Sequence, residues 1–113
     1  MSINKDCFTK LERKELRRLS SLAYEHALAK ALESLEEKFG QWKKNKITSF
    51  ELSDSIHKFH NGIARDLWSF YRNGDDEMIV VHAVAKGILS REEIKGALWP
   101  KIEQKVNMLR DKF

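Results

Sequence analysis

Cysteine and proline are nearly absent from these 113 residues, which contain one of each, Cys7 and Pro100. A single cysteine excludes an intramolecular disulfide and a zinc site made of cysteine pairs. One proline and five scattered glycines exclude a collagen-like chain and a turn-rich β fold. Because helix breakers are so few and 34% of the residues are charged, the composition predicts an all-α fold.

Long apolar runs are missing as well. The densest one, residues 78–85, is interrupted by His82 and is too short to span a bilayer. The first ten residues hold no apolar core of a secretion signal, so we expect a cytoplasmic protein without a membrane partner. The length suits one hydrophobic core, and we expect a single helical domain over residues 1–113 with residues 1–8 loose.

Capping patterns and breakers predict five or six helices. T-x-x-E or S-x-x-E boxes begin at Thr9, Thr48 and Ser90, and each favours a helix start. The expected elements are a long helix over 10–39 that ends before Gly40, a second from 49 that Asn61-Gly62 can split, a buried helix at 78–86, a helix after Ser90 and a last helix from Pro100. We expect the long N-terminal helix to pack around the buried helix at 78–86.

The apolar stripe of the long helix changes face near Leu28. Leucines and alanines of its first half fall on one side of a helical wheel, and those of its second half fall on the other: Leu16, Leu19, Leu22, Ala23 and Ala27 against Leu28, Ala31, Leu32, Leu35 and Phe39. No glycine or proline lies there to bend the helix. We therefore expect the two halves to bury opposite faces against different partners, one of which is a second subunit.

Polar side chains gather in one predicted helix. Asp54, His57 and His60 are spaced by three, and Arg65 follows. A carboxylate and two imidazoles can bind Zn²⁺ or Fe²⁺, two histidines can serve as an acid and a base on a phosphodiester, and Arg65 suits an anion. The competing interpretation is structural, with Asp54 orienting His57 and both histidines packed beside the apolar stripe. Because H-E-x-x-H and glycine-rich phosphate loops are missing, we predict no metal and no cofactor.

Basic residues form two clusters. Lys10, Arg13, Lys14 and Arg17 share one arc of the long helix. Near its other end Trp42 lies in a second cluster, formed by Lys38, Lys43, Lys44 and Lys46. Basic clusters with an aromatic can hold a phosphate backbone. Glutamates lie between the clusters, which favours an ordinary solvated face and at most weak, salt-sensitive binding of nucleic acid.

Residues 42–89 also resemble a known group of sequences. The stretch ITSFELSDSIHKFHNGIARDLW and the later AVAKGIL are similar to small bacterial helical proteins that have no assigned function. The resemblance implies no activity, cofactor or partner, and only marks His57–Arg65 as the region of likeness.

The leading hypothesis from the sequence is a non-enzymatic interaction or regulatory module that forms a homodimer or binds another protein. One alternative is a small metal- or phosphate-binding hydrolase that uses Asp54, His57, His60 and Arg65. The other is a nucleic-acid-binding accessory protein.

Overall fold

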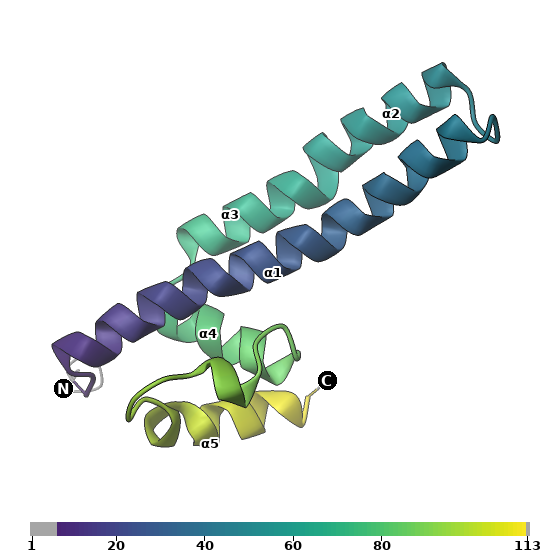
Figure 1. Cartoon of the computed structure of the whole chain (residues 1–113). Coiled ribbons are helices and arrows are strands. Elements are labelled where there is room, and N and C mark those ends of the chain that lie inside the picture. Colours follow the sequence, from purple (N-terminus) through teal and green to yellow (C-terminus); the bar gives the residue numbers. More distant parts are fainter. Residues whose placement is uncertain (1–6, 113) are drawn as a thin grey trace. The chain divides into compact units, whose positions relative to one another are not determined.

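The computed structural model describes residues 7–112, and every regular element in that range is helical (Figure 1). Helices α2 and α3 join without a break through a π turn, η2. The described residues therefore form four continuous helical segments and one short 3₁₀ turn, where five or six helices were predicted. In chain order the elements are α1 (Lys10–Lys43), α2 (Ser49–Phe59), η2 (His60–Ala64), α3 (Arg65–Asn73), α4 (Asp76–Ala85), η3 (Arg91–Glu93) and α5 (Trp99–Arg110).

Helix starts follow the predicted caps. The Thr9 backbone N–H donates to Glu12 Oε1 at 2.8 Å, and the Glu12 N–H donates to Thr9 Oγ1 at 3.1 Å. Thr48 forms the same reciprocal box at the start of α2. Ser90 also forms a capping box, but only the 3₁₀ turn η3 follows it, so the helix expected there is absent from the described residues.

The end of α1 corrects the prediction made from Gly40. That glycine lies inside the helix, which runs on to Lys43. The chain leaves the helix at Asn45, whose φ of 58° is left-handed. The Asn45 N–H donates to the Trp42 carbonyl and the Lys46 N–H to the Gln41 carbonyl, the pair of bonds of a Schellman cap. Asparagine tolerates this conformation because its short polar side chain bonds locally.

The chain divides into two compact units that share α1. The core unit comprises residues up to Ala23 and from Gly74 onward, and the hairpin unit comprises Tyr24–Asn73. The first half of α1 buries Leu16, Leu19 and Ala23, and these belong to the core unit. The second half buries Ala31, which belongs to the hairpin unit. Within one uninterrupted helix, the first half thus buries a stripe, whereas the second half buries Ala31 and leaves Leu32 and Phe39 exposed.

Helix α4 lies at the centre of the core unit. Ile79, Val80 and Ala83 are fully buried, as the apolar composition of 78–86 predicts, whereas Met78 and Lys86 at its two ends are exposed. The helix packs mainly against α5, which contributes the fully buried Ile102 and Val106. The expected packing of the long helix around 78–86 is therefore not confirmed.

Polar contacts fasten the start of α1 within the core unit. Lys101 Nζ on α5 bonds Glu12 Oε1 at 2.6 Å and also donates to the Cys7 carbonyl. Phe8 beside it is buried. The end of the segment predicted to be loose is thus held in place, and residues 1–6 lie outside the described range.

The hairpin unit consists of the second half of α1 and the rod formed by α2, η2 and α3, which run side by side (Figure 1). Only two apolar side chains of this unit, Ala31 and Leu52, are buried. Tyr24 stacks on Tyr71 with ring centroids 5.1 Å apart, and Phe70 meets Tyr71 edge-on. The hairpin therefore relies on aromatic stacking and half-buried contacts rather than on a closed core.

Candidate functional site

The four polar residues predicted as a site divide into two pairs. Asp54 Oδ2 bonds Lys58 Nζ at 2.9 Å, an i,i+4 ion pair on the open surface, instead of orienting His57. His57 is exposed. His60 and Arg65 both line a pocket of the hairpin unit, to which Asp54 and His57 do not contribute. The structure therefore brings together two of the four residues.

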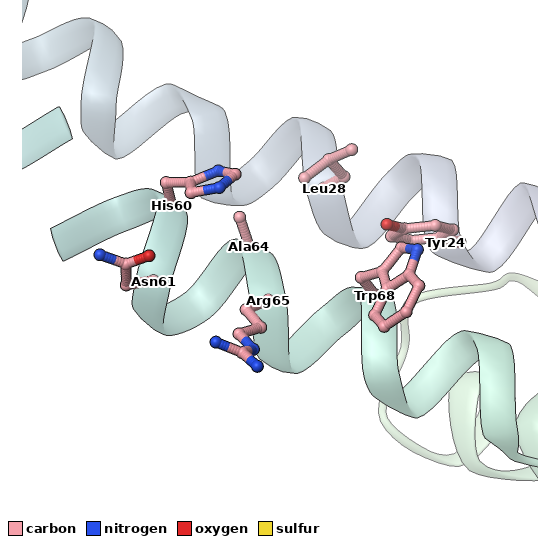
Figure 2. Close-up of a pocket in the computed structure, with 7 residues that line it drawn as sticks. All are labelled: Tyr24, Leu28, His60, Asn61, Ala64, Arg65 and Trp68. Carbon is pink, nitrogen blue, oxygen red and sulfur yellow. The ribbon is translucent and has the colours of Figure 1, made fainter. Parts of the chain in front are cut away.

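That pocket, the hairpin pocket, has a volume of about 450 Å³. In Figure 2, Tyr24 and Leu28 come from α1 and the remaining lining residues come from the facing rod. Side chains of His60, Ala64 and Trp68 point toward α1, while Asn61 and Arg65 lie on the outer side. Seven residues line it: Tyr24, Leu28, His60, Asn61, Ala64, Arg65 and Trp68.

The π turn explains why this set differs from the predicted stripe. A π turn closes i→i+5 hydrogen bonds and holds about one residue more than an α turn, so the residues after it are rotated back relative to an unbroken helix. Ile63 is 50% exposed and does not line the pocket. Ala64 and Trp68 line it, and Trp68 is also 50% exposed. Asn61-Gly62 therefore widens one turn rather than splitting the element.

Both aromatic walls of the hairpin pocket have partners of their own. Tyr71 stacks on Tyr24, and burial raises the pKa of Tyr71, so its phenol stays protonated at neutral pH. The Arg72 guanidinium carbon lies 5.2 Å from the centroid of the Trp68 ring, a cation–π distance. The two walls are therefore positioned before any ligand arrives.

His60 is the one imidazole in the lining of the hairpin pocket. No carboxylate lines the pocket, so His60 is not paired with one there. Within residues 7–112, no group of three or more His, Cys, Asp or Glu side chains is placed to hold a metal ion.

The basic residues proposed for nucleic acid have different local surroundings. Arg13 donates to the Phe8 carbonyl at 3.0 Å, and Arg13 and Arg17 line a pocket of the core unit together with Asp75, Asp76 and Glu77. Lys10, Lys14, Lys43 and Lys44 are exposed. Trp42 is tied through its indole N–H to Ser49 Oγ at 3.0 Å.

Sequence reasoning missed Tyr24, Leu28 and Asn61 as members of a pocket, and it assigned Trp68 to packing. The i,i+4 spacings Tyr24–Leu28 and His60–Ala64–Trp68 were the available signal, because such residues share a helix face. The spacing alone does not show that these two faces meet.

Comparisons with family models, with curated proteins and with solved structures find no match to this chain. The likeness of residues 42–89 to small bacterial helical proteins stays a prediction. None of the helices within residues 7–112 combines the length and the apolar character that crossing a membrane would require.

Proposed function

We propose that this chain is a helical interaction module that forms a homodimer through its hairpin unit. The observation that carries the proposal is the uneven burial of the two units. Apart from Ala31 and Leu52, every buried apolar side chain belongs to the core unit. Helices draw most of their stability from packing an apolar face, so a hairpin this open needs something to cover it.

The surface left uncovered is large and apolar. Six big side chains of the hairpin unit outside its pocket are between 38% and 88% exposed. At about 200 Å² per side chain and roughly half exposure, they present on the order of 600 Å² of apolar surface. A stable interface buries about 800 Å² on each partner, more than half of it apolar. The six are Leu32, Phe39, Trp42, Phe50, Ile56 and Ile63.

The spacing on α1 favours a helical partner. Leu28, Leu32, Leu35, Phe39 and Trp42 are separated by four, three, four and three residues, which is the a/d spacing of a helix that packs on another helix. Leu28 already faces the rod of its own chain, whereas Leu32, Phe39 and Trp42 stay exposed and can contact a further helix. Two helical hairpins form a four-helix bundle, and a two-fold axis lets one surface serve both copies. A second copy of this chain supplies the missing half without any other component.

The test compares the same substitution at two leucines of α1. Leu32 is 45% exposed in the hairpin unit, and Leu11 is 78% exposed in the core unit. The mass in solution is measured by light scattering across a concentration series for the wild type, Leu32→Glu and Leu11→Glu. We expect the wild type and Leu11→Glu to have twice the 13.3 kDa mass of one chain, and Leu32→Glu to shift toward the monomer.

Circular dichroism on the same samples shows whether Leu32→Glu keeps its helices. Even a weak specific complex forms at protein concentrations on the order of 100 μM. A wild type that is still monomeric at that concentration contradicts the proposal. A Leu11→Glu variant that dissociates as readily as Leu32→Glu contradicts it too, because the hairpin would then not be the interface.

A further inference from the structure

We infer that the hairpin pocket binds a small planar molecule that carries a negative charge, an aromatic ring bearing a carboxylate or a phosphate. This ligand site goes beyond the proposed dimer: none of the six exposed apolar side chains lines it, and Leu28 is the one lining residue that also belongs to the α1 stripe used to argue for self-association. Four observations support it: the size of the pocket, the type of its walls, its uncompensated positive charge and the π turn beside it.

The size suits a metabolite-sized ligand. At about 450 Å³ the pocket lies within the range of roughly 300–1,000 Å³ that such sites occupy. The lining also has the usual mixture, with apolar and aromatic walls and a few polar groups that can fix an orientation. Leu28 and Ala64 supply aliphatic surface, and the short Ala64 side chain leaves room beside the π turn.

The walls favour a flat ligand. Tyr24 and Trp68 are the aromatic residues of the lining, and an aromatic ligand meets such rings by offset stacking or edge contacts. Each ring already contacts a partner, Tyr71 or Arg72, so part of its side-chain freedom is lost before a ligand binds.

The charge favours an anion. Arg65 and His60 line the pocket and no carboxylate does, nor is Arg65 in a salt bridge within the described residues. In the core unit, by contrast, Arg13 and Arg17 line a pocket with three acidic side chains. A guanidinium binds a carboxylate or phosphate through two parallel hydrogen bonds, and the Asn61 amide can add another.

The π turn of the backbone lies at the hairpin pocket. The π turn begins at His60 and ends at Ala64, so three of the pocket residues, His60, Asn61 and Ala64, lie in it. Single π turns inside α-helices occur frequently at functional sites.

The experiment titrates the full-length protein with phenyl phosphate and phenylacetate, and separately with benzyl alcohol and inorganic phosphate as the two halves of such ligands. The readout is the indole N–H resonance of Trp68 in nitrogen-15 NMR spectra, assigned by its loss in Trp68→Phe. We expect one or both aromatic anions to bind with a dissociation constant on the order of 1 mM or tighter, and each half alone to bind at least tenfold more weakly. The preferred anion distinguishes a phosphate from a carboxylate.

Three variants test the assignment of residues. Arg65→Gln should weaken the aromatic anions about tenfold and leave benzyl alcohol unchanged, because only the charged contact is lost. Ala64→Leu should abolish binding of every probe, since a larger side chain fills the pocket while leucine still favours a helix. Lys30→Gln removes an exposed charge from α1 outside the pocket and should change nothing.

The inference is overturned if no probe shifts the Trp68 resonance of the wild type, whether because the pocket rejects them or because the partner copy fills it. It is also overturned if benzyl alcohol binds as well as the anions, or if Arg65→Gln and Lys30→Gln weaken binding equally. Circular dichroism of each variant separates loss of the pocket from loss of the fold, and a folded Ala64→Leu that still binds contradicts the location.

Discussion

Leu19→Ala is expected to destabilise the core unit by about 3 kcal/mol. Leu19 is completely buried in the first half of α1. Truncation to alanine removes about three carbon groups from the core at roughly 0.8 kcal/mol each, and the cavity left behind adds to the loss. Alanine is the better helix former, so helix propensity does not account for any loss.

The control is Leu11→Ala, the same change on the same helix and in the same unit. Leu11 is 78% exposed, so its truncation should alter the free energy of unfolding by no more than about 0.5 kcal/mol. Urea unfolding followed by circular dichroism measures both variants, and hydrogen exchange of the α4 amides assigns the loss to the core unit. A cost below about 1 kcal/mol for Leu19→Ala, or equal costs for the two, refutes the burial that we assign to this stripe.

Three other changes test separate features of the molecule. Gly40→Ala should stabilise the protein by about 0.5–1 kcal/mol in thermal or urea unfolding, because Gly40 lies inside α1 with open space where a Cβ would go. A loss of stability in this variant would show that α1 ends before Gly40. Asn45→Ala should lower the stability of the fold by about 1 kcal/mol, because φ is 58° at this position and alanine adopts that conformation poorly. Asn45→Gly should be neutral or stabilising. Equal effects of the two substitutions would argue against the left-handed cap. The hydrogen bond from Lys101 lowers the pKa of Glu12 below its usual 4.5, so this carboxylate stabilises the fold fully above that value and loses its effect as the pH falls through its folded pKa. Glu12→Gln should therefore reduce the loss of stability measured in acid below pH 4.5, and an unchanged acid profile would show that the pair is not formed.

The local chemistry of the helix starts was predictable from the sequence. Thr9, Thr48 and Asp75 bond the first-turn N–H groups of their helices as short polar residues do. The end of α1 was not predictable from the sequence. Glycine is common at a C′ position but also occurs, at some cost, within a helix. Only the geometry shows that Asn45 takes the left-handed position.

Longer-range features were beyond the reach of the sequence pattern. The segment after Ser90 has a capping box, yet it forms only a short turn because α1 holds it: the Lys95 N–H donates to Glu15 Oε2 at 2.7 Å, and Arg18 donates to the Glu93 carbonyl at 2.7 Å. Residues this far apart give no periodic signal.

The π turn was hidden for a different reason. Assigning apolar positions at 100° per residue assumes a regular α-helix, and one wider turn changes the face of every later residue. The π turn at His60–Ala64 changes the face of Arg65 but not of Asp54 or His57, which precede it. Spacing by three did not show that, of the four residues, only His60 and Arg65 line the hairpin pocket.

The most direct test of hairpin-mediated self-association is an NMR measurement of contacts between copies. A sample mixed from isotope-labelled and unlabelled protein reports only those nuclear Overhauser effects that cross from one copy to the other. The account predicts such effects at the methyl groups of Leu32, Ile56 and Ile63, which are between 39% and 50% exposed in one chain. Cross-copy effects confined to core-unit methyls such as those of Met108, or none at a concentration where light scattering gives a dimer, would contradict it.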